Sequence, residues 1–128
     1  MGFNEKLSQT ITLKDGRILG YAEVGNLGDS TVFWFHGGGS SRFEIKFLEE
    51  LAHQHKLSII APDRPGIGLS SFKKDRTLLD WPADIKELAE NLGIDKFAVA
   101  GVSGGGLYVC TTSNVWEIVL LSIKMIIH

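Results

Sequence analysis

The chain has 128 residues, which is enough for one domain at most. Apolar residues make up 44% of it and charged residues 22%, an ordinary globular composition that excludes a disordered chain. The net charge is −2 and the basic residues are not clustered, so neither nucleic acid nor a membrane surface is expected as a partner. The single cysteine, Cys110, excludes an internal disulfide. The first ten residues lack the apolar core of a signal peptide, so we expect a cytoplasmic protein.

The N-terminal segment predicts an antiparallel β-hairpin. Residues 8–13 alternate between polar and apolar side chains, Asp15-Gly16 marks a turn, and residues 18–24 form the return strand. Residues 31–35 (TVFWF) are continuously apolar, which is typical of a strand buried on both faces.

Helices and strands then alternate along the chain. Residues 42–55 have helical spacing, and residues 57–61 and 97–100 are short apolar runs that predict buried strands. The apolar face expected for the helix at 42–55 is Phe43, Phe47, Leu48, Leu51 and Ala52. A hairpin followed by such alternation predicts an α/β fold with a largely parallel sheet.

A second amphipathic helix is predicted over residues 78–92. Asp80 is expected to cap its N-terminus, and Pro82 suits the first turn of a helix. Gly93 is expected to end the helix before the last of the buried strands.

The residues around Ser103 have the pattern Gly-x-Ser-x-Gly. An apolar strand precedes the pattern and apolar residues 107–110 follow it, which is the strand–turn–helix layout of a nucleophile elbow. Gly101 and Gly105 fit this turn because the neighbouring strand and helix leave no room for a Cβ atom. In a chain with 15 glycines the pattern alone is weak, and a glycine-rich turn with a helix-capping serine is the alternative.

Two further motifs follow the other buried strands. HGGG (residues 36–39) comes directly after residues 31–35, and PDRPG (residues 62–66) comes directly after residues 57–61. Ligand chemistry in open α/β sheets collects beyond the carboxyl ends of the strands. Three motifs at three strand ends therefore favour one site far more strongly than any of them alone.

In this order, the three motifs resemble the N-terminal part of an α/β-hydrolase domain over about residues 10–109. The branch that they resemble contains iminopeptidases, esterases and haloalkane dehalogenases. The resemblance implies a truncated domain at residues 8–110, with an N-terminal antiparallel hairpin and then parallel strands alternating with helices. It implies Ser103 as the nucleophile and the backbone N–H groups of Gly38 and Gly104 as the oxyanion hole.

The same resemblance implies a small-molecule carbonyl substrate, an ester or an amide, with neither a metal nor a cofactor. His36 and Gly37 would support the oxyanion loop, and His36 is not expected to be the base because it precedes Ser103 in the chain. Asp63 and Arg64 would hold the PDRPG turn.

In the resembling fold, an acid and a histidine follow the serine in the chain. Only 128 − 103 = 25 residues follow Ser103 here, and they offer Glu117 and the terminal His128. Neither stands where the family has its acid or base, so we expect the chain by itself to be inactive or nearly so. The alternative is a non-catalytic interaction module or truncated form that self-associates, or pairs with another chain, through an exposed sheet edge.

The C-terminal tail, residues 111–128, departs from the resemblance. Its polar run at 111–114 predicts an early end to the helix that follows Ser103. The apolar stretch at 115–127 predicts a sixth strand at 118–123, or is not family sequence at all. It is too short for a membrane span and carries Glu117 and Lys124, so no membrane partner is expected.

Overall fold

The structure is a computed structural model that describes residues 3–26, 29–113 and 119–120. In chain order its elements are α1 (Phe3–Lys6), β1 (Gln9–Thr12), β2 (Ile18–Gly25), β3 (Ser30–Phe35), the 3₁₀-helix η1 (Arg42–Leu48), α2 (Glu49–Gln54), β4 (Leu57–Pro62), α3 (Asp80–Leu92), β5 (Ala98–Gly101), α4 (Gly105–Ser113) and β6 (Val119–Leu120).

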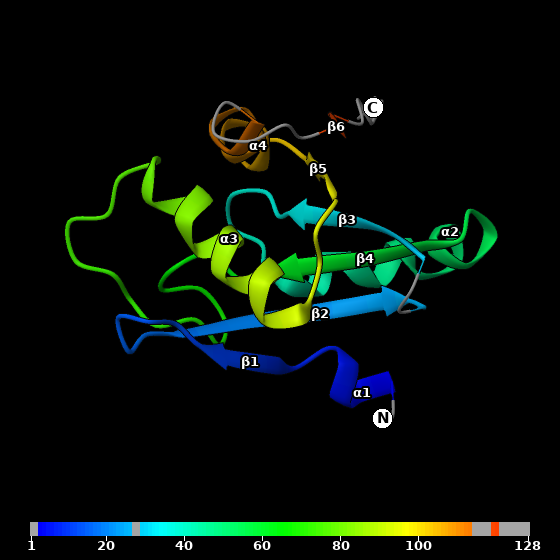
Figure 1. Ribbon diagram of the computed structural model, residues 1–128, viewed down its shortest axis with the longest axis horizontal. Helices are drawn as coiled ribbons and strands as arrows, with labels where there is room; N and C mark the ends of the chain where they lie inside the picture. Colours follow the sequence, from blue (N-terminus) through cyan, green and yellow to red (C-terminus); the bar gives the residue numbers. More distant parts are fainter. Residues whose placement is uncertain (1–2, 27–28, 114–118, 121–128) are drawn as a thin grey trace.

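The strands form one sheet in the order β1-β2-β4-β3-β5-β6. β1 and β2 form the predicted hairpin, and β2 pairs with β4 in the antiparallel sense. β3 runs parallel to both β4 and β5, as Figure 1 shows for β3 and β4. The predicted α/β fold with a largely parallel sheet is confirmed. Its parallel part brings the carboxyl ends of β3, β4 and β5 to the same edge.

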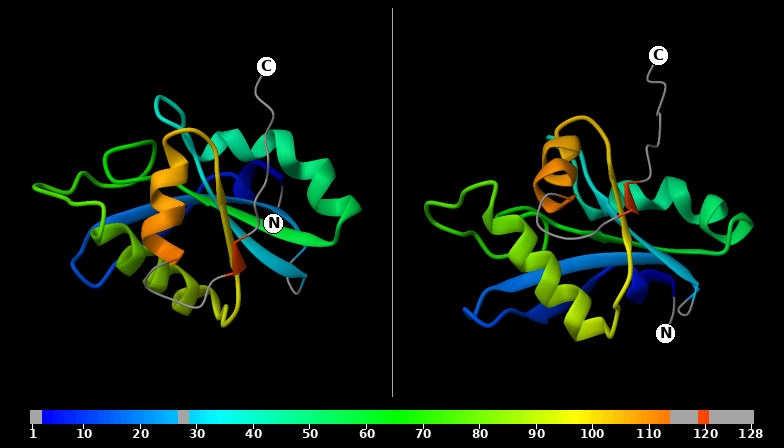
Figure 2. Two further views of the ribbon diagram at one scale, coloured as in Figure 1. Left: turned by 90° about the horizontal axis from the view of Figure 1, so that it is seen from above. Right: turned by 45° about the horizontal axis from the view of Figure 1, so that its top comes forward.

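Helices cover both faces of the sheet, with α3 on one side and the η1–α2 segment on the other (Figure 2). Because side chains alternate along a strand, β3 sends Phe33 and Phe35 toward α3 and sends Val32 and Trp34 toward η1. All four of these side chains are buried. The expectation of a strand buried on both faces is therefore confirmed for β3.

The segment after the HGGG motif differs from the expected helix in type and in the face that it buries. η1 is a 3₁₀-helix, which has three residues per turn, so Arg42, Ile45 and Leu48 share the face toward the sheet. Phe43 and Phe47 face outward and are 41% and 89% exposed. The predicted apolar face is wrong for Phe43 and Phe47 because it assumed the 3.6-residue period of an α-helix in a segment that is a 3₁₀-helix. Of its five residues, Phe43, Phe47 and Leu51 are exposed, Leu48 is half-buried and Ala52 is buried.

The second predicted helix is present as α3, with one difference at its start. The N-cap residue is Leu79, and Asp80 is the first residue of the helix, so the predicted capping by Asp80 is wrong. Its carboxylate instead accepts a hydrogen bond of 2.8 Å from the Thr77 N–H. Pro82 lies in the first turn as expected, and Gly93 ends the helix with the left-handed angles φ 70° and ψ 30°.

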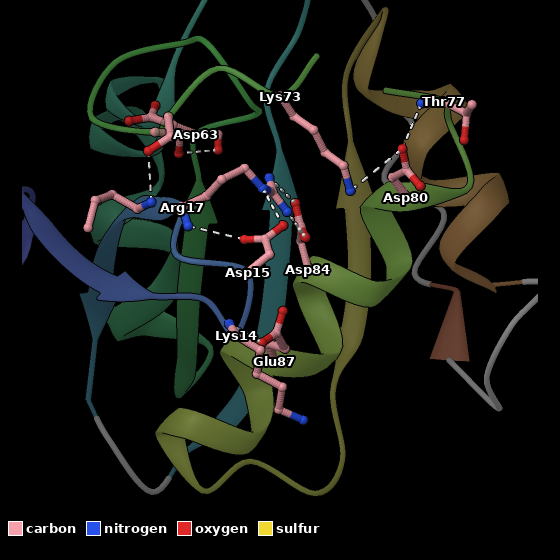
Figure 3. A network of polar contacts seen from close by, with 12 residues as sticks. Lys14, Asp15, Arg17, Asp63, Lys73, Thr77, Asp80, Asp84 and Glu87 are labelled. Atoms are coloured by element: carbon pink, nitrogen blue, oxygen red, sulfur yellow. Dashed lines mark hydrogen bonds and ion pairs between the residues drawn. The ribbon is translucent and has the colours of Figure 1, made fainter. Parts of the chain in front are cut away.

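Arg17 ties α3 to the hairpin turn. Its guanidinium donates to both carboxylate oxygens of Asp84 at 3.0 and 2.7 Å, and its Nε donates to Asp15 at 2.8 Å (Figure 3). The hydrogen bond to Asp84 is the main reason that the pKa of Arg17 is raised. Close by, the Lys14 N–H donates to Glu87 at 2.8 Å. These contacts hold α3 at a fixed position across the sheet.

α4 continues through residues 111–113, so the predicted early end of this helix is wrong. The hydroxyl groups of Thr111 and Thr112 both donate to the carbonyl oxygen of Tyr108, at 3.0 and 2.7 Å. This bonding satisfies the hydroxyls without leaving the helix. β6 falls within the segment predicted as a sixth strand and pairs in parallel with β5; the other tail residues from 114 on lie outside the described residues. None of the described helices is long and apolar enough to cross a membrane.

Candidate active site

The three motifs meet at the carboxyl ends of β3, β4 and β5. The Val102 N–H donates to the carbonyl oxygen of Phe35 at 3.4 Å, which joins the serine turn to the end of β3. The Arg64 N–H donates to the His36 ring at 3.3 Å, which joins the PDRPG loop to the HGGG loop. The parallel sheet therefore assembles segments that lie tens of residues apart in the sequence.

Ser103 lies exposed at the tight turn between β5 and α4. Its φ is +52°, a left-handed value that is uncommon for a residue with a side chain. Hydrogen bonds of 2.9 Å from Gly105 N–H to Val102 O and of 3.0 Å from Gly106 N–H to Ser103 O close the turn into the helix. The strand–turn–helix geometry agrees with the motif, while the role of Ser103 as nucleophile stays a prediction.

The glycines on either side of Ser103 are required by close backbone approach. A Cβ on Gly105 would lie 2.0 Å from the carbonyl oxygen of Phe35, far inside contact distance. A Cβ on Gly101 would lie 2.9 Å from the Gly105 carbonyl group. The elbow therefore packs directly against the end of β3, which is where the HGGG motif begins.

The HGGG loop passes beside Ser103. A Cβ on Gly37 would lie 3.7 Å from the Cβ of Ser103, and a Cβ on Gly104 would lie 3.2 Å from the Gly38 nitrogen. Among the described residues, neither the Gly38 N–H nor the Gly104 N–H donates a hydrogen bond to the protein. No atom of the described residues lies within 4 Å of a Cβ placed on Gly38. Two N–H groups without an acceptor in this part of the chain therefore lie near Ser103, and their role as an oxyanion hole stays a prediction.

His36 is almost fully buried at 1% exposure. Its Nε2 accepts the hydrogen bond from the Arg64 N–H, so the proton of the neutral ring is on Nδ1, which donates to Gly37 O at 2.9 Å. Burial is the main reason that the pKa of His36 is lowered, which favours the neutral ring. Both ring nitrogens are used within the loops, in agreement with a supporting role rather than that of a base.

Arg64 reaches beyond its own turn into the HGGG loop. It is 5% exposed, and its guanidinium donates to the carbonyl oxygens of His36 and Gly37, the latter at 3.2 Å. The ring of Tyr108 covers it, with the guanidinium carbon 4.4 Å from the ring centroid. Burial is the main reason that the pKa of Arg64 is lowered. The sequence predicted support of the PDRPG turn and did not predict this contact.

Asp63 is fully buried and joins the PDRPG turn to η1. Its carboxylate accepts from the Arg42 backbone N–H at 2.7 Å, from the Arg42 guanidinium at 2.8 Å and from the Leu69 N–H at 3.0 Å. Its carbonyl oxygen accepts from the Ser70 hydroxyl at 2.7 Å. With these partners the carboxylate holds loops together, in agreement with the expected scaffold role.

Glu44 contacts the site and was missed by sequence reasoning. Its carboxylate accepts from the Trp34 indole N–H at 2.6 Å and from the Gly37 N–H at 3.3 Å. The signal that could have found it is the spacing Ser41-x-x-Glu44, which is typical of a helix start. Ser41 does cap η1 through the Phe43 N–H, but Glu44 turns to the HGGG loop instead of back to the cap.

No acid–base pair for Ser103 is found among residues 3–26, 29–113 and 119–120, where no histidine or carboxylate is hydrogen-bonded to it. Glu117 and His128, the two candidates considered above, lie outside the described residues. Within the same part of the chain, no group of three or more His, Cys, Asp or Glu side chains is placed to hold a metal.

Comparison with known proteins places this geometry in a family. A family model described as the alpha/beta hydrolase fold matches residues 31–114, a range that contains all three motifs. A proline iminopeptidase from Lactobacillus delbrueckii subsp. lactis is 32% identical over an alignment 85 residues long, which covers 59% of this chain and 29% of that protein. The chain therefore spans less than a third of the length of the curated relatives that it matches.

Solved structures agree on the fold. A CIB-like hydrolase from Thermoplasma acidophilum matches with a TM-score of 0.76 and 20% identity, over 88% of this chain and 58% of its own. An alpha/beta hydrolase fold protein from Chitinophaga pinensis matches with a TM-score of 0.75 and 24% identity, over 90% of this chain and 42% of its own. Because the family model matches residues 31–114, which are more than half of the chain and include all three motifs, the chain belongs to the α/β-hydrolase fold family.

Proposed function

We propose that the chain carries the nucleophile and the oxyanion hole of a serine hydrolase that acts on ester or amide carbonyl compounds. The observation that carries the proposal is Ser103, which is exposed, has a left-handed φ and lies near the N–H groups of Gly38 and Gly104, neither of which has an acceptor among the described residues. Membership of the α/β-hydrolase fold family supports it, as does the similarity to a protein named proline iminopeptidase.

In this mechanism, the Ser103 Oγ attacks the substrate carbonyl carbon while a base takes the hydroxyl proton. The carbonyl electron pair moves onto its oxygen, which faces the N–H groups of Gly38 and Gly104. Each such donor contributes about 3 kcal/mol to lowering the barrier. Collapse of the tetrahedral intermediate expels the leaving group, which takes a proton when it is an amine, and leaves the acyl group on Ser103.

The base is the part of this mechanism that the described residues do not supply. His36 has both ring nitrogens engaged, and Glu117 and His128 lie outside the described residues. We therefore propose that this chain by itself transfers acyl groups slowly. An oxyanion hole without a base and an acid retains about 10³–10⁴-fold acceleration over water, far less than a complete triad.

Two labelling reactions test the proposal. A fluorophosphonate probe should leave Ser103 unlabelled, whereas p-nitrophenyl acetate with excess imidazole as an external base should acetylate Ser103, as peptide mass spectrometry would show. Ser103→Ala should abolish that acetylation, and Ser40→Ala should not. Stoichiometric fluorophosphonate labelling would disprove the claim that the chain lacks a working base for Ser103. Absence of acetylation at Ser103 would disprove the role of this residue as the nucleophile.

A further inference from the structure

We propose that Arg64 is a positioning residue of the oxyanion hole, which acts by fixing the direction of the Gly38 N–H through the carbonyl group of Gly37. The inference rests on the proposed function, because the direction of the Gly38 N–H matters for catalysis only if an oxyanion forms beside it.

One peptide unit links the contacts of the Gly37 carbonyl group to the direction of the Gly38 N–H. Gly37 C=O and Gly38 N–H belong to the same planar trans peptide, so they point in opposite directions. The Gly37 oxygen accepts from His36 Nδ1 at 2.9 Å, from Arg64 Nη2 at 3.2 Å and from the Ser40 N–H at 3.3 Å. The Gly38 N–H on the other side has no protein acceptor among the described residues. Rotation of this peptide unit, which would turn the Gly38 N–H to another direction, would break all three bonds.

The polar backbone groups just before this peptide unit, the His36 carbonyl group and the Gly37 N–H, also form hydrogen bonds. Arg64 Nη1 donates to the His36 oxygen, and the Gly37 N–H donates to Glu44. Arg64 therefore contacts two consecutive carbonyl groups with the two ends of one rigid fork. A lysine ammonium is a single compact charge and would not reproduce this pair of contacts.

The buried charge of Arg64 has no carboxylate partner among the described residues. Arg42 is equally buried at 5% exposure, and it forms an ion pair of 2.8 Å with Asp63. None of the ion pairs among the described residues includes Arg64, whose polar partners are the two loop carbonyls. Burying a cation without a carboxylate is costly. A cation hydrogen-bonded to Gly37 O polarises the shared peptide and strengthens the Gly38 N–H as a donor. The free energy spent on burying the guanidinium would therefore be offset by stronger binding of an oxyanion.

The test uses Arg64→Met and Arg64→Lys, with Arg17→Met as the matched control. Arg17 is also an arginine with two partners, its side chain 13% exposed, but it lies at the hairpin turn (Figure 3). Two quantities are measured on the 128-residue chain: the Gly38 backbone amide resonance in ¹H–¹⁵N spectra, and the rate of imidazole-assisted acetylation of Ser103 by p-nitrophenyl acetate.

We expect Arg64→Met to move the Gly38 resonance and to slow acetylation about 10- to 100-fold, because a small misplacement at a reacting centre has an effect of that size. Arg64→Lys should fall between wild type and Arg64→Met. Arg17→Met should lose stability and keep both site readouts at wild-type values.

The outcomes separate this inference from the proposed function. A folded Arg64→Met chain that is acetylated at the wild-type rate overturns the inference and leaves the proposed function intact. If the wild-type chain is not acetylated, the proposed function fails, and a Gly38 resonance unmoved in both variants overturns the positioning role as well. Should Arg64→Met fail to fold, Arg64→Lys decides, since it keeps the charge and most of the side-chain volume.

Discussion

Gly105 and Gly106 are neighbours in the first turn of α4 with opposite surroundings. A Cβ on Gly105 would lie 2.0 Å from Phe35 O, whereas a Cβ on Gly106 would have no atom of the described residues within 4 Å. Gly105→Ala should therefore lower the free energy of unfolding by about 2–3 kcal/mol, because the end of β3 has to move. Gly106→Ala should raise it by up to about 1 kcal/mol, since alanine is the better helix former. Urea unfolding of both variants measures the difference, and equal stabilities would contradict the close packing of elbow and strand.

His36 predicts a pH dependence of stability. Burial lowers its pKa in the folded chain below the unfolded value of about 6.5, so the unfolded chain binds the proton first as the pH falls. The contribution of the neutral ring is complete above about pH 6.5 and is lost progressively below it. We expect the urea midpoint to fall between about pH 7.5 and pH 5.5, and to fall less in His36→Gln. Parallel pH profiles for the two proteins would argue against a buried neutral His36.

At the scale of elements, the attachment of α3 to the hairpin depends on the Arg17–Asp84 pair. Asp84 has a side chain only 4% exposed, whereas Glu90 on the same helix is 53% exposed in its 4.0 Å pair with Lys86. Asp84→Asn should lower the free energy of unfolding by about 2–4 kcal/mol because it leaves a largely buried Arg17 charge with weaker compensation. Glu90→Gln should change it by less than about 0.5 kcal/mol. Chemical denaturation of this matched pair checks the prediction, and a small effect of Asp84→Asn would show that packing alone holds α3.

The η1 segment shows how far an element can be predicted locally. Helical spacing correctly indicated a helical segment after the HGGG motif. It indicated the wrong buried face, because the choice between 3.0 and 3.6 residues per turn is made by tertiary contacts of Arg42 with Asp63 and of Glu44 with Gly37. The capping role predicted for Asp80 was wrong for a similar reason. The preceding loop places the Thr77 N–H where it donates a hydrogen bond to the Asp80 carboxylate.

At the scale of the whole molecule, stability depends on which phenylalanine side chains are buried between the sheet and the helices that cover it. Phe33 is fully buried, with its ring 4.7 Å from that of Phe97 in an edge contact, and Phe47 is 89% exposed. Phe33→Ala should lower the free energy of unfolding by about 3–5 kcal/mol, because it leaves a cavity between the sheet and α3. Phe47→Ala should lower the free energy of unfolding by less than about 0.5 kcal/mol, since the side chain is 89% exposed. Thermal unfolding of both variants tests this, and a large loss for Phe47→Ala would place that residue in a core.

Apart from the short α1, the sequence by itself determined the order of strands and helices along the chain, the hairpin, the largely parallel sheet and the three strand-end motifs. The elements follow from apolar periodicity and from glycine and proline positions, and the parallel part of the sheet follows from the alternation of strands and helices. The position of Ser103 at a strand-to-helix turn was predictable for the same reason.

Only the tertiary structure decided what holds the site. Arg64 meets His36 and Gly37 across separations of 28 and 27 residues, and no local pattern indicates which carbonyl groups a buried guanidinium will reach. The tautomer of His36 and the partner of Glu44 likewise depend on loops from different strands that the sheet brings together. Contacts of this kind arise from packing, because burial leaves each polar group only the partners that the completed fold places beside it.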